Sequence, residues 1–220
     1  MPWFFFRILL FYRSKQGADM KTINKFCLLI FIVFSTGCGP QFIRMEKPNT
    51  PIERPTYTIL SPHGDGWLFH EEDAASQHAL FFHLLPKSTS HTIYANVIEV
   101  PSYAKFKTPD EFLSFIKNQE QVGFNYKRFS IIDEDMKLDN RFGDYSVLHY
   151  SKIEDHGAAN PGKYPYLIME TYTYFFIHPH AKNLMIMTSY SERGGIDELD
   201  KDFKAKAILF MEGLRFKKGE

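Results

Sequence analysis

Alternating apolar and polar positions predict a β-hairpin before the middle of the chain. Residues 92–100 carry apolar side chains at every second position, which is typical of a strand with one buried face. These positions are Ile93, Ala95 and Val97. Residues 77–85 form a second strand-like run, and residues 86–90 between the two runs have the composition of a hairpin loop. The two strands are therefore expected to pair in antiparallel.

Four further runs predict strands, two of them at the centre of a sheet. Residues 127–132 and 144–153 are predicted strands, and the charged segment 133–141 between them is expected to be a solvent-exposed loop. Residues 164–177 are apolar or aromatic on both faces, which indicates a strand that is covered on both sides. Residues 184–190 follow a short turn and are expected to return as the second central strand.

Apolar residues at intervals of three and four predict two helices. The first begins after Thr108, a candidate N-cap, and Glu111 completes a capping box with it. Its apolar positions, up to its expected end at Gln119, are Phe112, Phe115 and Ile116. The second helix is predicted over residues 197–211, with Gly213 as its stop signal.

Strands outnumber helices and short loops join them, so the expected fold class is α+β, a mostly antiparallel sheet with helices packed on it. The single domain is expected to cover residues 57–218. The preceding residues, 38–56, contain four prolines and almost no apolar periodicity, which predicts an extended tether.

A signal sequence is indicated before this tether. Basic residues in 20–25 precede an apolar run over residues 26–34, and small residues then lead to Cys38. This nine-residue core is too short for a membrane-spanning helix, which needs about 20 residues. We interpret residues 20–37 as the signal peptide and residues 1–19 as an over-extended start or a leader.

The last residues of this segment, Ser35, Thr36, Gly37 and Cys38, resemble the lipobox of bacterial lipoproteins, although Ser35 stands where that family usually has Leu. The resemblance implies cleavage before Cys38 and acylation of this residue with chains such as palmitate. Stable anchoring requires more than one acyl chain. Gly39 rather than Asp follows Cys38, which implies sorting to the outer membrane of a Gram-negative envelope, facing the periplasm.

The charge balance changes when the signal is removed. The whole chain has 26 basic and 26 acidic residues, and the part from Cys38 onward retains 21 basic and 25 acidic residues, a net charge of −4. An acidic domain without a basic stripe argues against nucleic acid as the partner.

Two polar clusters at predicted strand ends form the candidate binding surface. They consist of Glu154, Asp155, His156, Tyr190, Glu192 and Arg193. A carboxylate beside a histidine orients its ring and raises its pKa, so the first cluster offers an acid–base pair. The alternative, which we favour, is a structural network in which Arg193 pairs with Glu154 or Asp155 and fixes the connection.

His178 and His180 have a spacing that is common among metal ligands, and His156 or His149 would complete a zinc-type site. We favour instead a hairpin tip with two exposed imidazoles, because the spacing specifies no third ligand. No cofactor or bound metal is therefore predicted.

The acidic cluster and the remaining motifs point to no enzyme class. Asp133, Glu134, Asp135 and Asp139 lack the glycine and the closing glutamate of an EF-hand calcium loop. The chain has no Gly-x-Ser-x-Gly elbow, no His-Glu-x-x-His motif and no phosphate-binding glycine loop. The common enzyme classes that are recognised by these motifs are thus excluded.

The order of the predicted elements resembles the PsbP-like fold. Residues 153–156, 176–179 and 189–194 also resemble short motifs of uncharacterised proteobacterial lipoproteins. These resemblances imply a binding or accessory role without a known enzymatic activity.

Together, these features favour a lipid-anchored envelope protein that acts as a non-catalytic binding or accessory module for an envelope protein or a small ligand. One alternative is a metal-dependent or acid–base hydrolase that uses His156, His178 and His180. Another is a structural subunit of an envelope assembly, which would expose an apolar patch on the sheet or on the helix 197–211.

Overall fold

The computed structural model describes residues 41–71, 78–84, 90–101, 104–181 and 183–218. All of them belong to one compact unit. The predicted signal peptide and Cys38 lie outside the described residues, so the expectations about them stay predictions.

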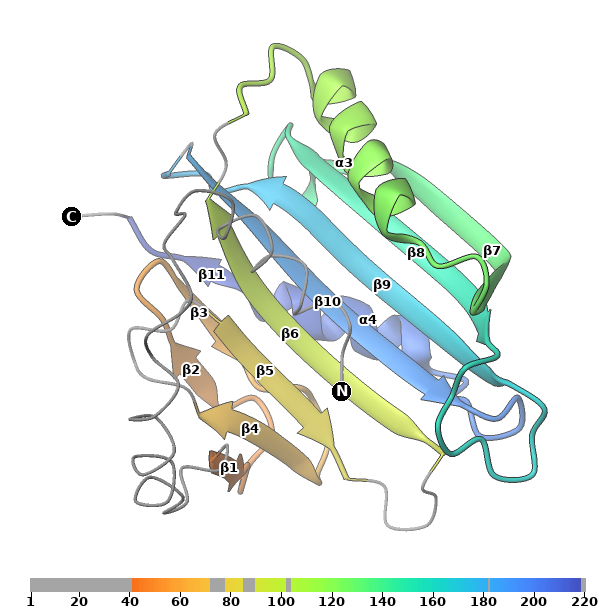
Figure 1. Ribbon diagram of the computed structural model, residues 1–220. Coiled ribbons are helices and arrows are strands. Elements are labelled where there is room, and N and C mark those ends of the chain that lie inside the picture. The colour runs from red at the N-terminus through yellow and green to blue at the C-terminus, as the bar shows by residue number, and fades with distance from the viewer. Residues whose placement is uncertain (1–40, 72–77, 85–89, 102–103, 182, 219–220) are drawn as a thin grey trace, which may run out of the picture. The chain divides into compact units, whose positions relative to one another are not determined.

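An eight-stranded antiparallel sheet forms the body of this unit (Figure 1). The spatial order is β1 (Gln41–Arg44), β4 (Trp67–Glu71), β5 (His78–His83), β6 (Thr92–Pro101), β10 (Leu184–Gly194), β9 (Leu167–Ile177), β8 (Ser146–Asp155) and β7 (Phe129–Leu138). The predicted hairpin is present as β5 and β6, and the two runs expected to be central are the inner strands β9 and β10. The expected α+β class with a mostly antiparallel sheet is confirmed.

One face of this sheet is covered by helix α4 (Phe203–Glu212) and a small second sheet. The small sheet has the order β11 (Arg215–Phe216), β3 (Tyr57–Leu60) and β2 (Pro51–Glu53). Its Tyr57 and Ile59 join Trp67, Phe81 and Phe210 in a buried aromatic and aliphatic core. Burial of this apolar surface is the main stabilising contribution on this side.

Helix α3 (Pro109–Gly123) packs on the opposite face, over β7, β8 and β9 (Figure 1). Thr108 Oγ1 accepts a hydrogen bond from the Glu111 backbone N–H at 3.2 Å, as the predicted cap requires. Phe112 and Ile116 are buried against the sheet. The helix runs four residues beyond its predicted end at Gln119.

Part of the expected tether is folded. β1 pairs with β4 at the edge of the large sheet, and β2 pairs with β3. Arg54 is buried, and its Nε donates to the carbonyl of His78 at 2.7 Å. The folded region therefore begins before Tyr57. The sequence did not predict the short strands β1 and β2, because their side chains are largely exposed and show little apolar alternation.

The prediction of a loop over residues 133–141 is wrong for its first six residues. β7 continues through Leu138 and pairs with β8, with a register shift between Ile131 and Asp133. As the last strand of the sheet, β7 leaves nearly all its side chains exposed, so acidic residues are solvated in the extended conformation. Charges and bulges on an edge strand also oppose pairing with a second chain.

Helix α4 starts six residues later than predicted. The Gly195 N–H donates to Glu198 Oε2 at 2.8 Å, and the Asp200 N–H donates to Glu192 Oε1 at 2.9 Å. These side-chain acceptors satisfy backbone groups that a helix would otherwise pair, and so hold residues 195–202 as turns. The helix ends before Gly213, as predicted.

Candidate functional site

The six residues of the predicted binding surface are distributed over both faces of the sheet. Asp155 is 1% exposed, and its carboxylate accepts from Arg128 Nε at 2.6 Å and from Arg128 Nη2 at 2.7 Å. Arg193 Nη1 also donates to Asp155, at 3.3 Å. The pair formed by Arg193 and Asp155 is the one that the structural alternative anticipated.

Tyr190 and Glu192 lie on the opposite face, among the residues that α4 covers. Tyr190 is 3% exposed and Glu192 is fully buried. The Glu192 carboxylate bonds His91 Nε2 and the backbone N–H of Asp200. Both side chains support the core and the loop before α4, and neither offers a surface to a partner.

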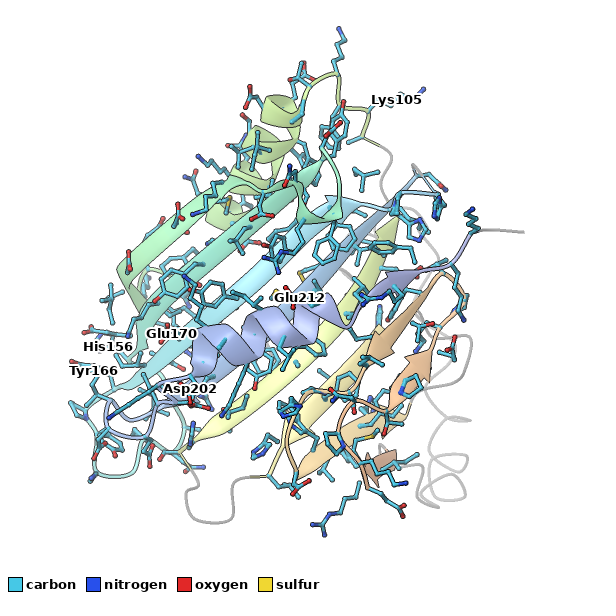
Figure 2. The ribbon with its side chains drawn as sticks, turned by 180° about the vertical axis from the view of Figure 1, so that it is seen from behind. Lys105, His156, Tyr166, Glu170, Asp202 and Glu212 are labelled. Carbon is cyan, nitrogen blue, oxygen red and sulfur yellow. The ribbon has the colours of Figure 1, made fainter. Side chains whose placement is uncertain are left out.

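Glu154 and His156 form a local pair at the end of β8. His156 Nε2 lies 3.0 Å from Glu154 Oε2 and 3.3 Å from Ser130 Oγ. Figure 2 shows His156 and Tyr166 at the same end of the molecule, and their rings are 5.2 Å apart. The structure thus brings these two predicted residues together.

The three histidines of the hydrolase alternative do not form a site. His178 is 1% exposed, its Nδ1 accepts from the His180 N–H, and its Nε2 lies 3.3 Å from the Thr56 carbonyl. Burial lowers the pKa of His178. The register of β8 and β9 places His156 at the other end of these strands, about 40 Å away at roughly 3.3 Å per residue. No group of three His, Cys, Asp or Glu residues within the described ranges is arranged to hold a metal ion.

A cleft between the C-terminal half of α3 and the edge strand β7 is the better candidate site. The α3–β7 cleft has a volume of about 320 Å³. Its lining residues are Lys117, Glu120, Gln121, Phe124, Tyr126, Ile131, Glu134 and Met136. Half of this lining is apolar or aromatic and half is polar, and the polar half contains two carboxylates and the Lys117 ammonium group.

His149 of β8 joins these two carboxylates at the base of the cleft. Its Nε2 lies 3.0 Å from Glu134 Oε1, and its Nδ1 lies 3.6 Å from Glu120 Oε2. The side chains of His149, Glu120 and Glu134 are 9%, 24% and 42% exposed, so the cluster is open to solvent from the Glu134 side. His149 Nε2 is thus hydrogen-bonded to Glu134, whereas Nδ1 lies near Glu120 but beyond hydrogen-bond distance of it.

Glu120 gains and loses its proton near neutral pH. Burial, together with the charge of Glu134, raises the pKa of Glu120 to about 7. Burial lowers the pKa of His149, against the opposing effect of the hydrogen bond to Glu134. Such coupled groups share protons as a unit, so the charge of the cleft changes around pH 7.

The sequence contains a signal for this site in its apolar stripes. Glu120 follows Phe112 and Ile116 at intervals of four, which places a carboxylate on the buried stripe of the helix. His149 shares a strand face with Val147, two residues before it. A polar residue that continues an apolar stripe is the expected sign of a desolvated functional group.

The chain is similar to several solved structures. No protein-family model matches the chain. No curated protein matches it either. Two solved structures that match are cyanobacterial PsbP from Synechocystis and LpqN, described as involved in cell envelope biogenesis of Mycobacterium tuberculosis.

PsbP is 12% identical, with a TM-score of 0.37, and the match covers 83% of this chain and 96% of PsbP. LpqN is 13% identical, with a TM-score of 0.45, and the match covers 80% of this chain and 91% of LpqN. PsbP is the neighbour that the order of elements led us to expect. At TM-scores below 0.5, neither structure informs the function of this chain.

Neither described helix has the length and apolar character that a membrane span requires.

Proposed function

We propose that this protein is a lipid-anchored, non-catalytic accessory module of the bacterial envelope, which presents the α3–β7 cleft to a partner protein. One relationship carries the proposal: β1, the first strand after the anchor, and β7, which forms the cleft, are the opposite edges of the eight-stranded sheet.

The anchor would hold the β1 edge close to the membrane. Only Gly39 and Pro40 separate Cys38 from β1, a span of at most about 10 Å. Near that edge, Phe42 is 45% exposed and Ile43 is 38% exposed. Exposed apolar side chains beside an acyl anchor suit contact with the interfacial region of a bilayer.

The cleft would then face away from the membrane. Seven strand spacings of roughly 4.8 Å separate β1 from β7, a distance of about 30 Å across the sheet. With the lipobox resemblance, this orientation would place the cleft in the periplasm, on an outer-membrane protein.

Binding rather than catalysis is supported by the state of His149. Its Nε2 is hydrogen-bonded to Glu134 and its Nδ1 lies 3.6 Å from Glu120, so a carboxylate lies beside each ring nitrogen in the place that a substrate would take. The hydrolase alternative finds no support, because His156 lies far from His178 and His180, at the other end of the strands.

A protein partner is favoured by the surroundings of the cleft. Of the residues that line it, Tyr126 is 69% exposed and Ile131 is 44% exposed. Aromatic and aliphatic side chains gathered at the rim of a cleft are typical of protein-binding surfaces.

The test is site-specific photo-crosslinking in intact cells. A benzophenone amino acid at Tyr126 is expected to capture one dominant envelope protein. The same group at the exposed Lys204 on α4 is the matched control and should capture background only. Equal patterns from both positions would refute the role of the cleft.

The variant Cys38→Ser tests the anchor. It should abolish incorporation of labelled palmitate and release the protein from the membrane fraction. Retention of the label in this variant would refute acylation at Cys38.

A further inference from the structure

An apolar patch lies on one face of the large sheet, beside the predicted anchor. The registers of β1 with β4 and of β4 with β5 place alternate residues of the three strands on this face, and the residue after β5 continues the alternation. The apolar members, which we call the β1–β5 patch, are Phe42, Leu68, Leu80, Phe82 and Leu84. None of them belongs to either buried core of the described residues. Helix α3 covers β7, β8 and β9, at the other end of the same face (Figure 1).

The β1–β5 patch is open to solvent. Phe42 is 45% exposed and Leu84 is 58% exposed, and the other three side chains are partly exposed. The ring centroids of Phe42 and Phe82 are 5.7 Å apart, so the apolar surface continues from β1 to β5. Contiguous apolar surface on a folded domain marks contact with another protein or with a membrane.

The charged positions on this face favour a membrane. Among the described residues of β1, β4 and β5 that share the face, none is acidic, although the chain from Cys38 onward has a net charge of −4. Its polar members are Arg44, His70 and His78. Arg44 is exposed, and the His70 ring lies 5.2 Å from the ring of Phe42. Apolar side chains bordered by basic groups, without a carboxylate, are complementary to acyl chains beneath anionic head groups.

We propose that the β1–β5 patch lies against the anionic surface of the phospholipid bilayer, with Phe42 and Leu84 at the boundary between head groups and acyl chains and Arg44 beside a lipid phosphate. This inference rests on the proposed function and names the lipid surface that orients the anchored domain. Cys38 precedes β1 by three positions, so its acyl chains would hold the patch within reach of the bilayer. A protein on this patch would have to fit between the strands and that membrane.

The test measures the depth of single spin labels on the mature lipoprotein in vesicles of phosphatidylcholine with about 30% phosphatidylglycerol. Cys27 lies in the predicted signal peptide and the Cys38 thiol would be acylated, so an introduced cysteine is the only site for the label. Leu84→Cys reports on the β1–β5 patch. Leu209→Cys is the matched control, because Leu209 is also an exposed leucine, at 47%, and belongs to α4 on the opposite face of the sheet.

The label at Leu84→Cys should collide more often with oxygen, which concentrates in the bilayer, than with a water-soluble nickel chelate. The label at Leu209→Cys should show the opposite preference. Adding Arg44→Gln to Leu84→Cys should lower the ratio of docked to undocked protein about fivefold, since it removes one basic group from an anionic surface. Lys204→Gln removes the same charge from an exposed position on α4 and should leave the depth unchanged.

Equal access of the nickel chelate to both labels would overturn the inference, and so would unchanged docking after Arg44→Gln. A label at Leu84→Cys that is shielded from both reagents would overturn it as well and indicate a protein on the patch. The anchor is tested separately, because labelling of the wild-type protein or its extraction from the vesicles by alkaline carbonate would refute the proposed function. Retention in the vesicles with the label at Leu84→Cys in water would refute this inference alone.

Discussion

His149 on β8 and Glu134 on β7 form a hydrogen bond of 3.0 Å that joins the edge strand to its neighbour at the base of the α3–β7 cleft. Glu120 of α3 approaches the other ring nitrogen of His149. The three residues therefore couple the packing of α3 on the sheet to protonation.

Replacement of Glu120 by Gln should make the stability of the protein less dependent on pH. The folded state raises the pKa of Glu120 from 4.5 to about 7, so it binds this proton more tightly than the unfolded state does. Stability should therefore fall as the pH rises from 4.5 to 7. Glu120→Gln should exceed the wild type by about 1–3 kcal/mol at pH 8 and by little below pH 4.5. Urea unfolding at both pH values measures this difference, and equal differences at both would contradict the prediction.

Glu99 on β6 should be a second source of pH dependence. It is 3% exposed, and neither carboxylate oxygen has a hydrogen-bond partner among the described residues. Burial raises its pKa to about 7. The ionised form is penalised only in the folded state, so Glu99→Met should raise the melting temperature at pH 8 more than at pH 5. The corresponding difference in the free energy of unfolding should be on the order of 3 kcal/mol. Calorimetry at the two pH values provides the test, and a lower melting temperature at pH 8 would refute it.

Loss of Asp155 should strongly destabilise the protein. Its removal leaves Arg128 without a bidentate partner and also deprives Arg193 of its bond. Breaking a buried ion pair from one side typically costs about 3–5 kcal/mol, so Asp155→Ala should lower the free energy of unfolding by that amount. Arg193→Ala, which removes a single bond of 3.3 Å, should cost about 1 kcal/mol. Similar losses in both variants would mean that Arg193 rather than Arg128 accounts for the contribution of Asp155, which would contradict the prediction.

The Asp155 contribution should also depend on pH. Burial raises the pKa of Asp155, but the hydrogen bonds and charge of Arg128, together with the Gly157 N–H and the charge of Arg193, outweigh this effect and lower the pKa below the ordinary value of 3.8. A lowered folded pKa means that the stabilisation is present at neutral pH and is lost as the pH falls through that folded value. Acid unfolding of the wild type compared with Asp155→Ala measures this loss.

The packing of α3 should depend on one face of the helix. Phe112 is fully buried against Val147 and Phe175, whereas Val122 on the same helix is 75% exposed. Phe112→Ala should cost about 3–5 kcal/mol because it leaves a cavity. Val122→Ala should change stability by less than about 0.5 kcal/mol. Guanidinium unfolding of the two variants compares them directly, and a small effect of Phe112→Ala would mean that α3 is not essential to the core.

Local sequence signals were sufficient for the elements with strong patterns. Thr108 and Glu111 located the start of α3, and the stripe of Phe112 and Ile116 identified its buried face. The alternation of Ile93, Ala95 and Val97 did the same for β6. Such patterns are reliable because the period of a helix or strand is fixed by backbone geometry and is read from neighbouring residues alone.

The edges of the sheet could not be predicted in this way. Residues 133–138 resemble a solvated loop in composition, but they form the end of β7 because β8 supplies the pairing partners. β1 likewise becomes a strand only beside β4. An edge strand leaves most side chains in water, so its extended conformation is specified by a distant partner and leaves almost no hydrophobic pattern of its own.

By itself, the sequence determined the fold class, the inner strands, the cap of α3 and the prediction of a lipid anchor at Cys38. Only the tertiary structure decided that Glu120, Glu134 and His149, which come from a helix and two strands, meet at one cleft. The physical reason is that periodicity records whether a residue is buried, whereas the pKa of a carboxyl depends on which distant groups desolvate it and share its proton. For the same reason, the opposite positions of β1 and β7 follow from strand order, which no local pattern encodes.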